Sequence, residues 1–334
     1  MQRSVIRRSA RRALVGAALV VSLGYAGPAG DAAVAGGSPA SASPAACEAG
    51  PSAARVIRGK NHGQDPNSLT ASEAQARDAR LQVRIDRLVR SGLLRADGRL
   101  PFARFFRVRT HVHVITRSDG TGGVSGQQIR AQLQVINDAF AGDNARRSAR
   151  SPFRFRLASV DVTRNDAWYD WEVNGDGTET SEAIAAKKAL HRGGWADLNV
   201  YIAGLGSGLL GYATFPQDGV LPLDGLVLLN DSLPGGAAAP YNEGDTATHE
   251  IGHWLGLFHT FENGCAFPGD YVPDTPYQFD GGNIFFCAES DDTCAQPGTD
   301  PVHNYMSYGD DPCLDRFTTG QNLRMIGTWL AYRA

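Results

Sequence analysis

Three features are scarce in this sequence of 334 residues, and each shortage narrows the class of protein. Beyond the N-terminal region there is no apolar run long enough to span a bilayer, which argues against a membrane protein. The five cysteines include no C-x-x-C pair, the spacing on which zinc ribbons depend. Only three methionines are present, so a methionine inside a motif stands out from ordinary core filler.

Charge is divided unevenly along the chain, although the net charge is only −3. Residues 1–100 hold 15 basic and 7 acidic side chains, whereas the remaining residues hold 17 basic and 28 acidic ones. This division favours a basic N-terminal segment that docks on an acidic body, and it gives no indication of nucleic-acid binding.

Residues 1–35 are predicted to be an export signal. Five arginines between positions 3 and 12 precede the apolar stretch 13–23, which is too short to cross a bilayer comfortably. Cleavage would fit at Ala26 or at Ala33-Val34-Ala35, and the Arg11-Arg12 pair leaves a twin-arginine route open. We therefore expect a secreted, extracellular protein with no membrane association.

The cysteines agree with export. Four of them cluster in the last third of the chain, and in an exported protein this pattern predicts two disulfides. Cys47 has no partner left, and it lies in a stretch rich in Ala, Gly, Ser and Pro, 36–54, that is typical of a linker.

Periodicity indicates a mixed α/β sheet with helices beneath it. Thr70 and Glu73 form a capping-box pattern ahead of a helix that Gly92 stops, and a second amphipathic helix is expected over 125–141. Strands are expected from about Phe106, over 153–162, over 197–203 and over 226–229. If the strand 226–229 forms an exposed edge above a cleft, it would bind extended peptides by strand addition.

The sequence from His249 reads H-E-I-G-H-W-L-G-L-F-H. His249 and His253 are four residues apart, so on a helix both imidazoles project from one face and can bind one metal ion. Gly256 permits a sharp exit from the helix, and His259 can return as a third ligand. Three protein nitrogens leave an open position for water, as in catalytic zinc sites, and Glu250 is placed to take a proton from that water.

A downstream Met-turn completes the metzincin signature, and Asn304-Tyr305-Met306-Ser307-Tyr308 supplies it. The stretches T-H-E-I-G-H-W-L-G-L-F-H-T-F, D-T-P at 274–276 and N-Y-M-S-Y-G-D-D-P-C make this chain resemble the pappalysin family, as does G-Y-A-T-F-P at 211–216. The resemblance covers about 106–325 and is strongest after residue 198.

The resemblance implies a metzincin fold, with a twisted, mostly parallel five-stranded sheet, a backing helix, an active-site helix and an irregular C-terminal subdomain. It implies that Met306 forms a hydrophobic base under the metal and that Tyr308 hydrogen-bonds the reaction intermediate, beside the simpler view of Tyr308 as a core residue. It also implies the disulfides Cys265–Cys294 and Cys287–Cys313, and a calcium ion near the D-T-P segment. The calcium candidates, which could equally form an acidic surface turn, are Asp270, Asp274 and Thr275.

Two further assignments follow from position. Asp310 and Asp311 come directly after the Met-turn, where metzincins form a wall of the pocket for the residue after the scissile bond. Acidic side chains there would favour Arg or Lys, unless Pro312 turns both into a solvated loop. Cys47 could occupy the fourth zinc position and keep a zymogen inactive; an incidental linker cysteine and a lipidation site are the alternatives.

The sequence thus predicts a zinc metalloendopeptidase made as a zymogen. We expect a signal at 1–35, a prosegment at 36–104 and a catalytic domain at 105–334, acting as a monomer on extracellular proteins. Two alternatives remain: a catalytically silent scaffold of the same fold, and a zinc hydrolase of small amides.

Overall fold

The structure is a computed structural model that describes residues 55, 67–279, 281 and 284–334. All of these belong to one compact unit, Glu48–Ala334. The predicted signal, the linker 36–54 and Cys47 lie outside the described residues.

The sheet contains the five strands of the expected fold, in the order β2-β1-β4-β6-β5. The strands β1 (Phe106–Thr116), β2 (Phe153–Arg164), β4 (Asp197–Leu205) and β6 (Leu226–Leu229) are parallel to their neighbours, and β5 (Gly211–Ala213) is antiparallel to β6. The two-residue strand β3 (Asp170–Trp171) pairs with the end of β4. The predicted mixed, mostly parallel sheet is therefore confirmed.

Peptide binding by residues 226–229 depended on this strand forming an exposed edge, and the structure does not meet that condition. The strand β6 lies between β4 and β5, and its first three residues are buried. After β4 the chain reverses its direction, and β5 pairs antiparallel with the side of β6 that faces away from β4. The edge is therefore β5, which has only three residues and is too short to show an alternating pattern in the sequence.

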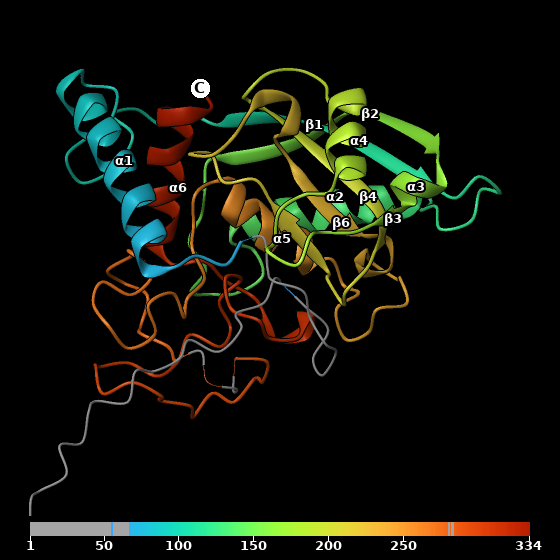
Figure 1. Cartoon of the computed structure of the whole chain (residues 1–334). Coiled ribbons are helices and arrows are strands. Elements are labelled where there is room, and N and C mark those ends of the chain that lie inside the picture. The colour runs from blue at the N-terminus through green and yellow to red at the C-terminus, as the bar shows by residue number, and fades with distance from the viewer. Residues whose placement is uncertain (1–54, 56–66, 280, 282–283) are drawn as a thin grey trace, which may run out of the picture. The chain divides into compact units, whose positions relative to one another are not determined.

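Helices cover both faces of the sheet (Figure 1). One face packs on α2 (Gly126–Ala141), α5 (Asp245–Trp254) and α6 (Thr319–Tyr332), which share the larger core. The other face carries α3 (Asp166–Tyr169) and α4 (Ser181–Leu190), with a smaller core around Trp171 and Tyr201. Short 3-10 turns form at Leu221–Leu223, Asn230–Ser232 and Asp311–Cys313.

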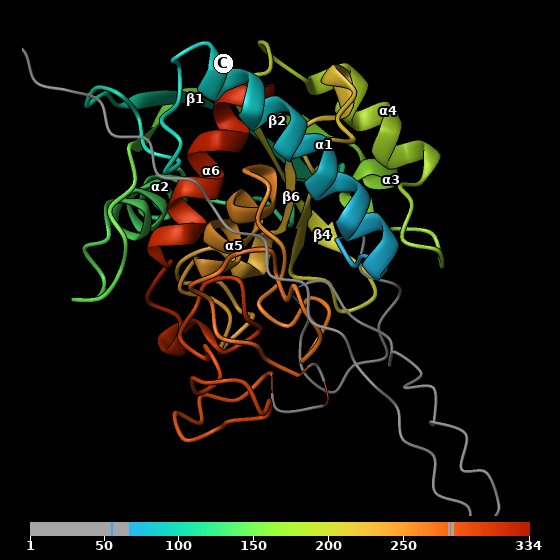
Figure 2. The same cartoon turned by 90° about the vertical axis from the view of Figure 1, so that its left-hand side faces the viewer.

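The helix predicted after Thr70 is α1 (Ala71–Arg90), and its capping box with Glu73 is formed. It lies beside α6 in both views (Figures 1 and 2). Arg77 pairs with Asp218 at 2.6 Å, and Asp78 pairs with Arg324 at 2.5 Å. The basic segment therefore supplies the positive charge in one ion pair with the body and the negative charge in the other. It also contacts the body through buried Leu81.

The region between α5 and α6 is irregular and carries the disulfides. Cys265 pairs with Cys294 and Cys287 with Cys313, as the resemblance implied. Their sequence separations of 29 and 26 residues correspond to about 3 kcal/mol of stabilisation each on a loop-entropy basis. The two disulfides thus stabilise a region that lacks the packed helices and strands of the rest of the fold.

Candidate active site

The helix α5 carries His249 and His253 one turn apart on one face, as the four-residue spacing predicts. Both histidines are 0% exposed. The helix ends in a Schellman motif: the N–H of Leu257 donates to the Gly252 carbonyl at 2.9 Å, and the N–H of Gly256 to the His253 carbonyl at 2.8 Å. Gly256 has φ of 87°, a conformation that other residues rarely adopt, and this turn brings His259 back to the pair.

The three imidazoles converge on one point. The Nε2 atom of His253 lies 3.1 Å from that of His249 and 3.0 Å from that of His259. The Nδ1 atoms of His249 and His253 donate to the carbonyls of Tyr305 (2.6 Å) and Leu257 (2.8 Å), which leaves Nε2 of both rings as an unprotonated acceptor. Converging lone pairs repel one another unless a cation lies among them, and nitrogens on a tetrahedral zinc are about 3.3 Å apart.

Burial keeps these rings neutral, as metal ligation requires. It lowers the pKa of His253 to about 4, and it holds the pKa of His249 and of His259 well below the usual range. The donor set thus fits a metal ion.

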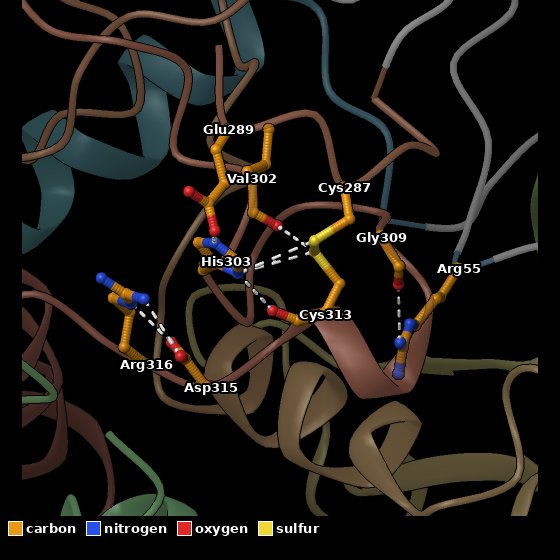
Figure 3. Close-up of a disulfide and its surroundings, with 9 residues drawn as sticks. All are labelled: Arg55, Cys287, Glu289, Val302, His303, Gly309, Cys313, Asp315 and Arg316. Carbon is orange, nitrogen blue, oxygen red and sulfur yellow. Dashed lines mark hydrogen bonds and ion pairs between the residues drawn. A yellow bond between two sulfur atoms is a disulfide. The ribbon is translucent and has the colours of Figure 1, made fainter. Parts of the chain in front are cut away.

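A second group of metal-ligating residue types joins Cys287, Cys313 and His303. The two cysteines are disulfide-bonded to each other, and Nδ1 of His303 lies 2.6 Å from the Cys313 carbonyl oxygen (Figure 3). A disulfide is a poor metal ligand because thiolates are what metals bind. This group therefore stabilises the loop that follows the Met-turn.

Met306 packs against the histidine helix α5. It is 0% exposed, and a Cβ atom added at Gly252 would lie only 2.3 Å from its sulfur. The glycine in H-E-I-G-H is therefore needed for the close approach of the Met-turn to α5. The backbone of Met306 also accepts a hydrogen bond from the N–H of Thr260, 3.2 Å away, next to the third histidine.

Glu250 and Tyr308 approach the histidine cluster from different elements. Glu250 is 1% exposed, and its Cγ would lie 3.1 Å from a Cβ added at Gly211, so its side chain lies against the edge strand β5. The hydroxyl of Tyr308 is 3.2 Å from Nε2 of His259. The Tyr308 hydroxyl is thus close to the point where the nitrogens converge, and Glu250 follows His249 directly in α5.

The two acidic residues after the Met-turn have different surroundings. Asp311 is 1% exposed, and its Oδ2 accepts the N–H groups of Glu243, Gly244 and Asp245 at 2.8, 3.0 and 3.3 Å. Gly244 is the N-cap of α5 and has no side chain to cap the helix, so Asp311 caps it from another part of the chain. Asp310 is half-buried, and within the described residues its side chain makes no such contact.

The surroundings of Asp311 also include residues that sequence reasoning missed. Oδ1 of Asp311 accepts a hydrogen bond from Arg55 at 2.6 Å, and the hydroxyl of Thr246 accepts another at 3.2 Å. Burial and the nearby Asp311 charge raise the pKa of Asp245 to about 8. An arginine in a basic segment carries no signal in the sequence that could have identified it.

The three calcium candidates have different surroundings in the structure. Asp274 accepts hydrogen bonds from the Thr318 hydroxyl (2.7 Å) and the Gly320 N–H (2.8 Å), so it caps α6. Oδ2 of Asp270 and the Thr275 hydroxyl are buried without a well-formed hydrogen bond among the described residues. Both line a cavity of about 290 Å³ formed by residues 267–273 and 275–277, and burial raises the pKa of Asp270 to about 8.

Comparisons with known proteins agree with this geometry. The family model described as pregnancy-associated plasma protein-A, peptidase M43, matches residues 186–329. An extracellular metalloprotease of Colletotrichum graminicola is 43% identical over 236 residues, which are 68% of this chain and 78% of that protein. Extracellular metalloprotease 1 of Coccidioides posadasii is 41% identical over 234 residues, again 68% and 78%.

Two solved structures of one Tannerella forsythia protease are also similar. Mature mirolysin in complex with a cleaved peptide is 28% identical with a TM-score of 0.55, over 67% of this chain and 91% of that one. A point mutant of promirolysin is 26% identical with a TM-score of 0.61, over 79% and 91%. No helix in the described part of the chain is long and apolar enough to cross a membrane. With relatives of this identity matched over more than two thirds of their length, the chain belongs to the M43 (pappalysin) family of extracellular metalloproteases.

Proposed function

We propose that the chain is a zinc-dependent endopeptidase, secreted as a zymogen, which acts as a monomer on extracellular proteins. The observation that carries the proposal is the convergence of three buried imidazole nitrogens, with separations of 3.0 and 3.1 Å, beside a buried glutamate. All of these residues come from one chain, so no second copy is needed to complete the site.

Each residue near the histidines has a distinct part in peptide hydrolysis. When bound, zinc supplies Lewis acidity, which lowers the pKa of water and polarises a carbonyl group. Glu250 accepts the proton of the attacking water and returns it to the amine of the departing product. The Tyr308 hydroxyl, 3.2 Å from Nε2 of His259, would donate a hydrogen bond to the substrate carbonyl oxygen as negative charge develops on that oxygen.

The edge strand β5 favours an extended polypeptide as substrate. One side of β5 is paired with β6, and Glu250, which follows His249 in α5, lies against Gly211 of this strand. A peptide added along this edge would bring its carbonyl groups to the site by backbone hydrogen bonds. The free edge argues against a hydrolase of small amides, because a small amide cannot pair with a strand. The intact base and ligand set argue against a catalytically silent scaffold.

The proposal is tested on a denatured protein mixture. The processed, zinc-loaded chain is expected to release peptides whose new ends are identified by mass spectrometry, and a zinc chelator is expected to stop their release. Cleavage that persists without zinc would contradict the proposed mechanism, and a complete lack of cleavage would favour the silent scaffold.

We further propose that the pocket of Asp311 receives a basic side chain after the scissile bond. The buried carboxylate has one oxygen engaged by the α5 N-terminus and the other directed at a guanidinium. Asp310 lacks these contacts, so we assign the preference to Asp311.

Latency is proposed to reside in residues 36–104. The match to promirolysin covers 79% of this chain, against 67% for the mature form. Cys47 precedes Arg55 by eight residues, which can span up to about 28 Å, and Arg55 contacts Thr246 of the histidine helix. We therefore propose that the Cys47 thiolate binds the metal.

Replacing Cys47 with Ala is expected to speed the appearance of activity in a freshly purified precursor by removing a metal-bound thiolate. In the Glu250→Gln precursor, X-ray absorption should show one sulfur in the zinc shell. A shell of nitrogen and oxygen alone in the intact precursor would end the switch hypothesis.

Asp270 and Thr275 are proposed to bind calcium with carbonyl groups of their loop. Calcium about a hundredfold above its Kd should raise the Tm by about 5 °C or more, and Asp270→Asn should abolish the rise. Without calcium, Asp270 is protonated in the folded state below pH 8 but ionised in the unfolded state above about pH 4, so stability falls as pH rises through this window. The rise in Tm caused by calcium should therefore be larger at pH 8 than at pH 6, because at pH 6 calcium must displace a proton from Asp270.

The control for the calcium prediction is Asp274→Asn. Because Asp274 caps α6, this change should lower the Tm equally with and without calcium. A calcium response in Asp270→Asn equal to that of the parent would rule out the site.

A further inference from the structure

The C-terminal end of the histidine helix α5 contacts two arginines from the end of the chain, one within α6 and one directly after it. Nε of Arg324 donates to the carbonyl of Gly256 at 2.9 Å, and Nε of Arg333 donates to the carbonyl of Trp254 at 2.9 Å. The last carbonyl groups of a helix have no N–H partner within it, and basic side chains can satisfy them. The two arginines therefore cap α5 and its terminal turn from another part of the chain.

Arg333 anchors the helix itself. Its Nη1 and Nη2 donate to the two carboxylate oxygens of Asp224 at 2.8 and 3.1 Å, and its guanidinium carbon lies 3.6 Å from the ring centre of Trp254. These three side chains are buried, and Asp224 also accepts a hydrogen bond from the indole N–H of Trp254 at 3.0 Å. The end of α5 is therefore anchored to the core directly after the second histidine, before the turn begins.

Arg324 acts on the turn that carries the chain from His253 to His259. Gly256 has φ of 87° in this turn, and a Cβ atom there would lie 2.8 Å from a side-chain atom of α6, so α6 packs closely against the turn. The guanidinium carbon of Arg324 lies 4.8 Å from the ring centre of Phe258, the residue directly before His259. Arg324 thus contacts the segment that decides where the third histidine lies.

The charge of Arg324 is matched by a residue of α1, the helix that lies beside α6 (Figure 2). Nη1 of Arg324 donates to Oδ1 of Asp78 at 2.5 Å, and the two side chains are only 6% and 15% exposed. An arginine removed from water is costly unless its charge is paired. The Asp78 carboxylate therefore stabilises a charged donor against the Gly256 carbonyl, and α1 supports the turn through Arg324.

We infer that Arg324 is a positioning residue of the metal site: it fixes the turn 256–258 so that His259 reaches the metal beside the two histidines of α5, and Asp78 fixes Arg324. Contacts that orient metal ligands from outside typically contribute about 10- to 100-fold to metal affinity. This inference rests on the proposed function for the identity of the metal, but its test measures the metal site and not catalysis.

The test uses the full-length chain with Glu250→Gln, so that the protein does not cleave itself during the measurement. Zinc affinity is measured by competition with a chelating dye, and adding Arg324→Ala is expected to weaken it by about 10- to 100-fold because His259 is less firmly placed. The visible absorption bands of the cobalt-substituted chain report the geometry of the ligands. They should change in Arg324→Ala, a result that a loss of general stability alone would not give.

Two further variants separate the parts of the device. Arg324→Lys keeps a charged donor that can approach the Gly256 carbonyl, and should restore much of the zinc affinity and the cobalt spectrum of the parent. Asp78→Asn leaves the arginine in place but removes its counter-charge, and should weaken zinc binding less than Arg324→Ala does.

The matched control is Arg84→Ala. Arg84 joins the same two helices, since it donates from α1 to the Ala331 carbonyl of α6 at 2.8 Å and lies 4.2 Å from the ring centre of Tyr332. Its loss should loosen the contact between α1 and α6 without changing the zinc affinity.

Zinc affinity and cobalt bands equal to those of the parent in Arg324→Ala would overturn the inference. An equal loss of affinity in Arg84→Ala would do the same, because it would assign the effect to helix packing and not to the turn. If Arg324→Ala does not fold, Asp78→Asn decides, and parent affinity in that variant would contradict the role of Arg324. Failure of the proposed function would appear separately, as a processed chain that binds zinc normally but cleaves no protein.

Discussion

Glu250→Gln is expected to lower kcat/KM for peptide cleavage by about 10²- to 10⁴-fold while one zinc ion per chain remains bound. Glutamine keeps the size and hydrogen bonding of the side chain but cannot accept a proton from water. The three histidines are untouched, and the carbonyl groups of Tyr305 and Leu257 still orient two of their rings. The measurements are the steady-state rate on a fluorogenic peptide and the zinc content by atomic emission.

The matched control is Glu262→Gln, which changes the second buried glutamate of the same region. It should alter kcat/KM far less, because this side chain is not on the histidine helix. Turnover close to that of the parent in Glu250→Gln would remove Glu250 as the base. Loss of zinc in that variant would instead mean that the glutamate supports the metal site structurally.

The second large effect is expected at Asp311. Asp311→Asn retains an oxygen that can cap α5 but removes the charge that faces the pocket. For the processed chain, kcat/KM on a peptide with Arg after the scissile bond should fall by about 10²-fold, since a buried guanidinium would lose its counter-charge. A peptide with Leu at that position should be cleaved about as well as before, so the ratio of the two rates measures the preference.

Asp310→Asn is the neighbouring control and should leave the ratio of rates unchanged, because the contacts with the α5 N-terminus are made by Asp311. A ratio that changes in Asp310→Asn and not in Asp311→Asn would reverse the assignment. A fall on both peptides in Asp311→Asn, together with a lower Tm, would show that its main role is to cap the helix.

Much of the fold was predictable because it depends on neighbours in the sequence. The capping box of Thr70 and Glu73 and the helix after Ser125 are local patterns, and both formed within a residue of the expected bounds. The long strands β1, β2 and β4 show alternation over enough residues to be recognised. The three-residue β5 and the alanine-rich helix α4 were missed, because the first is too short and the second too weakly periodic.

The metal centre could be predicted from local sequence alone. The four-residue spacing of His249 and His253 on a helix, the glycine turn and the return of His259 are set within eleven consecutive residues, so local geometry is sufficient. The packed chain was needed to show which strand forms the sheet edge, which of two adjacent aspartates caps α5, and that Arg55 pairs with it. Arg55 and Asp311 are 256 residues apart, and no periodicity reports on a contact of that range. Such contacts depend on the path of the whole chain, because they form only after the sheet, α5 and the disulfide-bonded loop have been packed together.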